Sequence, residues 1–479
     1  MKKIFYFMLS AAVFTFTACH KDENDVKDSG QENYRGFDGK DYTVHNFVYQ
    51  TFGAYYYWSN NVPSRINFEN FDTPYDVLES FREETDRFSD VLDNYTETTK
   101  YFDNDYKTDG TNYALYYADK TSDNIVAALT YVYSGSPAEK AGLKRGDVIT
   151  AVNGTKLTAS NYGTLLNETV CTYTYKTISP TTVDGETKIE WENSEEKTTE
   201  AVTKIDMKID PVLKVKTFLV DGKIIGYFLY DSFTQDTKTI MNAVEKLQAA
   251  QITDLVLDLR LNGGGYVTTL DTLASMLVPD GNEGNVFIRT EYNSLVSKFL
   301  EEEDPDFNKE YFVPISPKLN LSTLYVLISG STASASEELI SGLSPYMNIV
   351  IIGEKNSYGK FTSNVLINDD EDEGVDDNGT PYSEWAAYVS IACCKNSLGE
   401  MKFAKGFQPQ YVVKDTYREL GTLEEPLFSQ AVSLITGKTV AKKASAEVVF
   451  DCFGSSLGTF GKPEITKAAM ICKPNFKKH

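Results

Sequence analysis

A serine at the start of a predicted helix and two lysines after the next predicted strand are the side chains best placed for nucleophilic chemistry. Ser334 follows the apolar run of residues 324–328 through small side chains, and Lys355 and Lys360 follow the apolar run of residues 349–352. The carboxyl ends of parallel strands meet at one edge of a sheet, where active sites are common. A helix N-terminus also favours negative charge that develops beside a serine. These residues therefore predict an active site at this sheet edge.

Three consecutive glycines form a second candidate element of the same site. Gly263, Gly264 and Gly265 follow the apolar run of residues 255–259 and precede a predicted helix. Backbone amides at such a turn can point together at a negative oxygen, as an oxyanion hole or a phosphate cradle requires. No Lys-Ser/Thr pair follows, which excludes a P-loop. A tight turn that needs positive φ is the alternative interpretation.

Histidine and charge limit the other reactions available to this chain. Of three histidines, His20 and His479 lie near the ends, so a Ser/His/Asp triad, a Cys/His pair or a zinc site would have to use His45. His45 falls on the amphipathic face of a predicted helix, where packing is its usual role. The 69 acidic residues outnumber the 46 basic ones, and the net charge of −23 argues against nucleic-acid binding. We expect no cofactor and no metal.

The length and patterning predict several modules around this site. The 479 residues exceed a single core and suggest about three domains. We expect, in order, a signal peptide over residues 1–18, a tether over 19–38, a helical domain over 39–100, a β domain over 105–215, a catalytic core over 216–437 and a tail over 438–479 without an assigned role. In the core, strands are expected at 224–230, 255–259, 324–328 and 349–352, and helices at 237–250, 269–277 and 336–343.

The β domain carries an ordered set of turn signals. Ser136-Pro137-Ala138 opens a short helix that ends at Gly142, and Arg145-Gly146-Asp147 leads into an apolar strand. This order resembles the PDZ module. Residues 165–210 alternate in period two, with Asp184-Gly185 as a hairpin signal, and are expected to elaborate the domain.

The PDZ resemblance implies a peptide-binding site. PDZ modules bind an apolar C-terminal peptide by adding it as a strand to a sheet edge. The carboxylate-binding loop is expected near residues 112–115, ahead of a strand at residues 115–118, and the peptide contacts are expected at Tyr113, Ala114 and Leu115.

The segments around the candidate site resemble one enzyme family over residues 40–435. The small-residue strand exit, Ser334-Ala-Ser-Glu337, the next helix and strand, and Gly359-Lys360 are similar to the C-terminal processing peptidases, also called tail-specific proteases. The resemblance implies a serine endopeptidase with a Ser/Lys dyad and a PDZ module, acting on proteins or peptides. The expected fold class is α/β plus mixed modules, with a crotonase-like or ClpP-like core.

The same resemblance assigns roles to individual residues. Ser334 is the expected nucleophile and Lys360 the general base, and the amides of Ala335 and Gly264 form the oxyanion hole, with Gly265 as the alternative glycine. A lysine base must be neutral, so its pKa of about 10.4 must fall to roughly 7 to 8, which burial can achieve.

Three assignments keep alternatives. Either Glu337 or Asn364 orients the lysine, and Glu337 is favoured because Asn is shorter than the Gln of related enzymes. Ser336 competes with Ser334 but is expected to cap the helix. Lys355 is the alternative base, because the serine-to-lysine spacing is one residue longer than the common pattern.

The N-terminus predicts export. Lys2 and Lys3 precede an apolar run of residues 4–16, too short to span a bilayer but suited to a signal peptide. Thr17-Ala18-Cys19 resembles a lipobox, which implies a lipidated Cys19 and a protein of the cell envelope, anchored to either face of the outer membrane by lipid alone. Cleavage near Ala18 that leaves Cys19 free is the alternative.

Other interpretations carry less support. Ser-x-x-Lys occurs at residues 194–197 and 357–360, but the motif order and the missing Lys-Thr-Gly exclude the penicillin-recognising enzymes. The acidic stretch of residues 369–377 does not fit EF-hand spacing and is interpreted as a solvated loop. Cys452 and Cys472 could form a disulfide. A non-catalytic surface protein that binds peptides or glycans is the alternative function.

Overall fold

The computed structural model describes residue 36 and residues 38–118, 122–183, 186–369, 383–438, 456–460 and 469–471. The predicted signal peptide with Cys19, most of the tether, the acidic stretch after Asp369, and Cys452 and Cys472 lie outside the described residues. Among the described residues, no helix is both long enough and apolar enough to cross a membrane.

The N-terminal region consists of short helices that join the core through one strand. Its helices are α2 (Thr43–Tyr55), α3 (Pro74–Glu79) and α4 (Tyr95–Phe102), with 3-10 turns η1 (Ser59–Asn61) and η2 (Phe68–Asn70). Thr73 caps α3 in a capping box with Asp76, and Pro74 takes the first helical position. β1 (Asp90–Leu92) pairs antiparallel with β23 (Ala386–Asn396), so this region extends a sheet of the core. His45 is buried on α2 against the rings of Tyr42 and Phe68, which is a packing role.

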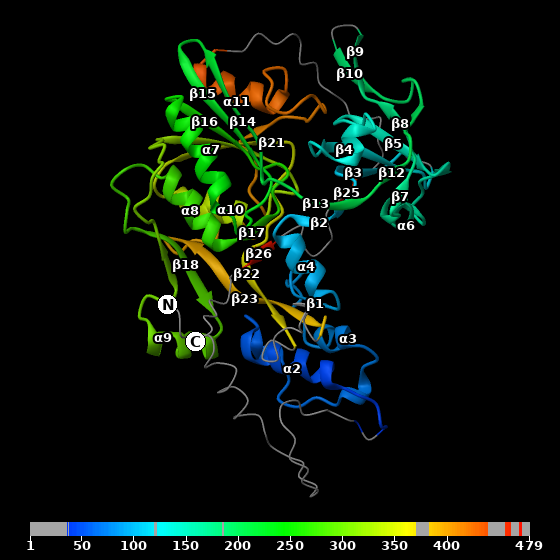
Figure 1. Cartoon of the computed structure of the whole chain (residues 1–479). Helices are drawn as coiled ribbons and strands as arrows, with labels where there is room; N and C mark the ends of the chain where they lie inside the picture. Colours follow the sequence, from blue (N-terminus) through cyan, green and yellow to red (C-terminus); the bar gives the residue numbers. More distant parts are fainter. Residues whose placement is uncertain are drawn as a thin grey trace, which may run out of the picture.

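The PDZ-like region is built on an antiparallel sheet with strand order β11-β8-β5-β4-β3-β25, to which β6 adds beside β5 (Figure 1). Ser136 caps the short helix α5 (Pro137–Lys140), and Asp147 begins β5, as the turn signals predict. A second helix, α6 (Tyr162–Asn167), packs its buried Leu166 into the same core as Tyr113 and Leu115 of β3. The strands of the sheet are β3 (Thr111–Tyr117), β4 (Ile125–Val132), β5 (Asp147–Val152), β6 (Thr155–Lys156), β8 (Tyr173–Thr177), β11 (Lys197–Thr198) and β25 (Ser456–Phe460).

Three strand pairs surround this sheet. β9 pairs with β10 across the predicted hairpin, with residue 183 opposite residue 186. β13 pairs with β2, and β12 pairs with β7. The strands are β2 (Asp105–Thr108), β7 (Val170–Cys171), β9 (Ser179–Val183), β10 (Glu186–Glu190), β12 (Val202–Thr203) and β13 (Ile205–Lys208).

The core is a layered α/β domain, as its alternating apolar runs predict. Its sheet has the order β14-β15-β16-β20-β21-β24, and all neighbours except β14 and β15 are parallel. One face packs against α7, α8 and α10, and the opposite face packs against α11. The elements are β14 (Val212–Val220), β15 (Lys223–Tyr230), α7 (Thr237–Ala249), β16 (Asp254–Asp258), α8 (Val267–Leu277), β20 (Thr323–Ile328), α10 (Ala335–Leu343), β21 (Asn348–Gly353), β24 (Tyr411–Val412) and α11 (Pro426–Thr436).

A second sheet of the core follows the order β17-β26-β22-β23-β18-β19, with β1 on β23. It includes the glycine strand β17 and the strand β22 that follows Lys360, so it lies beside the candidate site. The other strands of this sheet are β17 (Gly264–Tyr266), β18 (Val286–Tyr292), β19 (Lys309–Tyr311), β22 (Thr362–Asn368) and β26 (Ala469–Ile471). The helix α9 (Ser294–Glu303) lies in the chain between β18 and β19.

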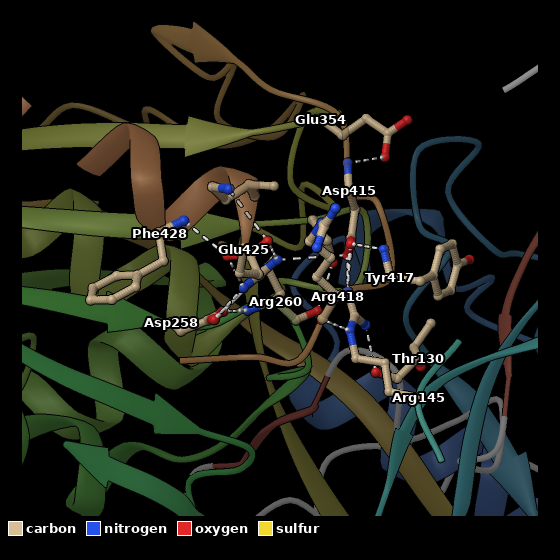
Figure 2. Close-up of polar contacts among 12 residues, drawn as sticks. Thr130, Arg145, Asp258, Arg260, Glu354, Asp415, Tyr417, Arg418, Glu425 and Phe428 are labelled. Carbon is tan, nitrogen blue, oxygen red and sulfur yellow. Dashed lines mark hydrogen bonds and ion pairs between the residues drawn. The ribbon is translucent and has the colours of Figure 1, made fainter. Parts of the chain in front are cut away.

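An ion-pair network joins the PDZ-like region to the core (Figure 2). Arg145 donates through Nη2 to Asp415, whose carboxylate also lies 3.6 Å from Nη1 of Arg260. Arg260 contacts Asp258 at 2.6 Å and Glu425 at 2.8 Å. Burial alone would lower the pKa of Arg260, but these carboxylates raise it well above its ordinary value. A charged chain of contacts therefore runs from the PDZ-like region to the end of β16, close to the glycine turn.

Candidate active site

Ser334 occupies a strained turn between β20 and α10. It is the N-cap of α10, with φ +61° and ψ −120°, a conformation that is rare for a residue with a side chain. Its side chain is fully buried, and its Oγ has no hydrogen-bond partner among the described residues. A buried hydroxyl without a partner carries a desolvation cost, and strain of this kind is characteristic of functional sites. The turn therefore holds a hydroxyl that is available for chemistry.

The carboxylate of Glu337 ties this turn to the lysine loop. It accepts hydrogen bonds from the backbone amides of Ser334 at 3.0 Å, Gly359 at 2.7 Å and Lys360 at 2.9 Å, and from the hydroxyl of Ser357. Burial raises the pKa of Glu337 to about 7, against the opposing effect of these hydrogen bonds. One side chain thus fixes the backbone of both the candidate nucleophile and the candidate base.

Lys360 is enclosed in the protein interior, where it interacts electrostatically with the buried Glu338. Its side chain is completely buried, and Nζ donates to the carbonyl oxygen of Thr362 at 3.2 Å and to Oδ1 of Asn364. The rings of Phe88 and Tyr388 lie 5.2 Å and 5.5 Å from Nζ. Burial disfavours the charged form of an amine, so this environment suits a lysine that acts as a base.

The two candidates for orienting the lysine have different contacts. Glu337, the favoured one, contacts the backbone of Lys360, whereas Asn364 contacts its amine. Nδ2 of Asn364 donates to the carbonyl oxygen of Phe88 at 3.1 Å, which turns Oδ1 toward the amine. The register of β22 against β23 shifts between Ser363 and Asn364, an irregularity that can redirect a side chain. Asn364 therefore reaches Nζ despite its short side chain.

The alternative serine, Ser336, and the alternative lysine, Lys355, have other surroundings than Ser334 and Lys360. Lys355 is exposed to solvent, whereas Lys360 is buried. The expectation that Ser336 caps the helix is wrong, because α10 begins at Ala335 and the cap is Ser334. Ser336 instead points back to the glycine turn, where its Oγ donates to the carbonyl oxygen of Asn262 at 3.3 Å.

One of the two amides expected to form the oxyanion hole, that of Gly264, already has a hydrogen-bond acceptor. The amide of Gly264 donates to Oδ1 of Asn262 at 2.8 Å, so it is occupied in this structure, and Gly265 is the remaining glycine candidate. Gly265 has φ +139°, and a Cβ at this position would lie 2.2 Å from the carbonyl oxygen of Phe233, so only glycine fits. Ala335 is the first residue of α10, where an amide has no acceptor within the helix.

Sequence reasoning missed three residues that shape the site. Asn262 holds the glycine turn and accepts from the amide of Ala333 at 3.2 Å, and its place directly before the glycines was the available signal. Ser357 donates to Glu337, and the Ser-x-x-Lys spacing of residues 357–360 was its sequence signal. Phe88 faces the amine of Lys360, and no local pattern marks it. Among the described residues, no group of His, Cys, Asp and Glu side chains could hold a metal ion.

The expectation of a loop at residues 112–115 is wrong, because these residues lie within β3 (Thr111–Tyr117) of the PDZ-like sheet. Tyr113, Ala114 and Leu115 are buried on β3, which pairs with β4 on one side and with β25 on the other.

Three family profiles match the chain in the predicted order. The profile of the peptidase S41 N-terminal domain matches residues 43–89, a PDZ domain profile matches residues 129–168, and the profile of peptidase family S41 matches residues 224–413. The last match includes both Ser334 and Lys360. The expected family, fold class and PDZ module are thereby confirmed.

Individual relatives agree with these profiles. The chain is 28% identical over 281 residues to the carboxy-terminal processing protease CtpA of Bacillus subtilis, covering 58% of this chain and 51% of CtpA. It is 31% identical over 157 residues to the tail-specific protease of Haemophilus influenzae, covering 32% of this chain and 20% of that protein. The chain therefore spans about half, or less, of the length of these curated relatives.

A solved structure supports the same fold. The crystal structure of a Bacteroides fragilis protein assigned to the S41 proteases superposes with a TM-score of 0.66 at 24% identity, covering 82% of this chain and 97% of that chain.

Proposed function

Because this chain belongs to peptidase family S41 and carries a PDZ domain, we propose that it is a serine endopeptidase that cuts proteins or peptides through a Ser334/Lys360 dyad. The observation that carries this proposal is the carboxylate of Glu337, which binds the backbone of the serine and of the lysine together. The Ser334 hydroxyl has no hydrogen-bond partner in the part of the chain that the structure describes, and the Lys360 amine is fully buried, so a carboxylate that fixes both backbones can hold the two groups for catalysis.

In the proposed reaction, neutral Lys360 takes the proton of the Ser334 hydroxyl as Oγ attacks the carbonyl carbon of the substrate. The amides of Ala335 and Gly265 stabilise the negative charge that forms on the carbonyl oxygen. Lys360 then gives the proton to the departing amine, and an acyl-enzyme remains on Ser334. Water attacks the ester with Lys360 again as base, which releases the new carboxyl end and restores the serine.

Asn364 and Glu337 act as positioning residues in this proposal. Asn364 holds the amine through Oδ1, and Glu337 holds the segment from which the lysine projects. The PDZ domain is proposed to bind the C-terminal tail of a substrate along β3 and to present upstream residues to Ser334. Export and a lipid anchor at Cys19 belong to the same proposal, with the enzyme on either face of the outer membrane.

Casein and reporter peptides test this function. The wild-type chain should hydrolyse them, and Ser334→Ala and Lys360→Ala should each lower the rate at least ~1,000-fold, as removal of a nucleophile or its base does. Lys355→Ala is the matched control, because this lysine is exposed, and it should retain the wild-type rate. Hydrolysis that persists in Ser334→Ala or Lys360→Ala would contradict the dyad. No hydrolysis by the wild type or by any variant that keeps Ser334 and Lys360 would favour a non-catalytic binding protein.

Mass spectrometry of the mature N-terminus tests the localisation. A diacylglyceryl-modified Cys19 as the first residue is expected, and an unmodified Cys19 would contradict the lipid anchor.

A further inference from the structure

The C-terminal tail supplies two strands, and each lies on a strand that the proposed function uses (Figure 1). β25 (Ser456–Phe460) pairs antiparallel with β3, with residue 458 opposite Leu115 and residue 460 opposite Tyr113. β26 (Ala469–Ile471) lies between β17 and β22 and is parallel to both. The two tail strands are separated by residues 461–468.

On the PDZ domain, β25 takes the position of a bound peptide. The strand order places β3 between β4 and β25, so β3 would be the edge of the sheet without the tail. An open edge offers unpaired amides and carbonyls, to which PDZ domains add a peptide as a further strand. Because β25 pairs along Tyr113, Ala114 and Leu115, it uses the edge that an incoming peptide needs.

In the core, β26 pairs with the strands that carry the glycine turn and Asn364. Residues 469 and 470 are opposite Gly264 and Gly265, and residue 471 is opposite Asn364. The tail backbone therefore lies between the glycine strand and the strand whose Asn364 contacts the lysine amine. A substrate that is attacked by Ser334 beside these glycines would need the same space.

The tail occupies the two positions in the reverse order of a C-terminal substrate. A substrate held by its C-terminus on β3 reaches the catalytic site with residues upstream of that end. In the tail, the segment at the catalytic site, 469–471, lies downstream of the segment on β3, 456–460. The tail therefore fills both positions but runs between them in the opposite direction to a substrate bound by its C-terminus. It would block the approach of such a substrate and would not be presented for cleavage in the same way.

Charge also favours this association. Residues 439–479 contain seven lysines and three acidic residues, whereas the whole chain has a net charge of −23. A basic segment is attracted to an acidic body over distances comparable to the Debye length.

We propose that the C-terminal tail is an intramolecular inhibitor that covers the PDZ edge with residues 456–460 and the catalytic site with residues 469–471. The assignment of these two surfaces rests on the proposed function. Displacement of the tail by a competing peptide would open both surfaces together.

Binding to full-length, inactive chains tests this inhibitor. All chains carry Ser334→Ala, and the probe is a labelled synthetic peptide of residues 454–474 with Cys472→Ser. Thr459→Pro combined with Met470→Pro breaks both tail strands, because proline cannot complete a ladder of hydrogen bonds. Ala446→Pro, in the same tail but outside both strands, is the matched control.

The probe should bind the strand-broken chain at least ~10-fold more tightly than the native-tail chain or the control, because a tethered competitor acts at an effective concentration on the order of millimolar. Without the probe, amide hydrogen exchange of residues 113–116 should also be faster in the strand-broken chain than in the native-tail chain or the control. Equal affinity for all three chains, or binding to none, would overturn the proposal.

Hydrolysis separates this inference from the proposed function. In chains with Ser334 intact, the strand-broken variant should cut a reporter peptide faster than the native-tail chain. Absence of hydrolysis in every chain would contradict the proposed function and leave the binding comparison to decide the role of the tail.

Discussion

Asn364→Asp tests whether the lysine amine must be neutral to act. The substitution keeps the shape of the side chain and places a carboxylate where Oδ1 now accepts from Nζ of Lys360. A negative charge beside an amine favours the protonated form, which cannot take a proton from Ser334. The variant should therefore be less active at neutral pH and recover activity at higher pH.

The magnitude follows from the burial of the pair. Both Lys360 and Asn364 are fully buried, so water screens the new charge poorly. An opposite charge at this range shifts a pKa by roughly 1 to 3 pH units. Because each pH unit changes the neutral fraction tenfold, kcat/KM at neutral pH should fall roughly 10- to 1,000-fold.

The assay is the pH dependence of kcat/KM with a reporter peptide. The profile of Asn364→Asp should move to higher pH, whereas Asn364→Ala, which removes the acceptor without adding charge, should lose rate without this upward movement. Asn356→Asp adds the same charge at an exposed position and should leave the profile unchanged. An Asn364→Asp profile that coincides with the wild type would refute the role of a neutral lysine.

Three further substitutions test the framework around the dyad. The pKa of Glu337 is raised by burial from 4.5 to about 7, so its stabilising contribution is complete below pH 4.5 and is lost as the pH rises through 7. Glu337→Gln cannot ionise, so its free energy of unfolding in urea should fall by about 3 kcal/mol less than that of the wild type as the pH rises from 4.5 to above 7. If the free energies of the two chains change with pH in parallel, the raised pKa is contradicted. Gly265→Ala should lower the free energy of unfolding by roughly 2–4 kcal/mol and abolish hydrolysis, because its Cβ meets the Phe233 oxygen. Gly163→Ala, which meets no atom within 4 Å, should have little effect, and equal unfolding midpoints for these two variants would count against the steric argument. Arg145→Ala removes one partner of the partly buried Asp415 and should cost roughly 2 kcal/mol, because Arg260 still lies 3.6 Å from that carboxylate. Exposed Lys140→Ala is its control in the same unfolding experiment, and a similar small loss for both would refute the role of the network.

The elements of the core could be predicted from the sequence because its strands are continuous apolar runs between turn signals. Residues 224–230, for example, correspond to β15, and residues 349–352 lie within β21. The helix start in the PDZ-like region could also be predicted, because Ser136 as N-cap and Pro137 as first helical residue depend only on neighbouring residues.

Contacts that depend on tertiary packing could not be predicted in this way. Asn364 reaches the lysine amine through a register shift between two strands that are far apart in sequence. Phe88 faces the same amine from the N-terminal region, whose β1 pairs with β23 of the core. The amide of Gly264 is occupied by a neighbouring asparagine, which a glycine run does not reveal.

The tail strands lack a sequence signal for a similar reason. β25 and β26 have five and three residues, too few to show a period. They form where other strands offer free edges, so their position follows from the fold of the rest of the chain.

The dyad is tested most directly by covalent labelling of the full-length chain with a serine-reactive fluorophosphonate, followed by peptide mass spectrometry. One adduct on Ser334 is expected in the wild type and in Lys355→Ala, and a far slower reaction is expected in Lys360→Ala at neutral pH. An adduct on another serine, or labelling of Ser334 at the wild-type rate without Lys360, would contradict the Ser334/Lys360 dyad.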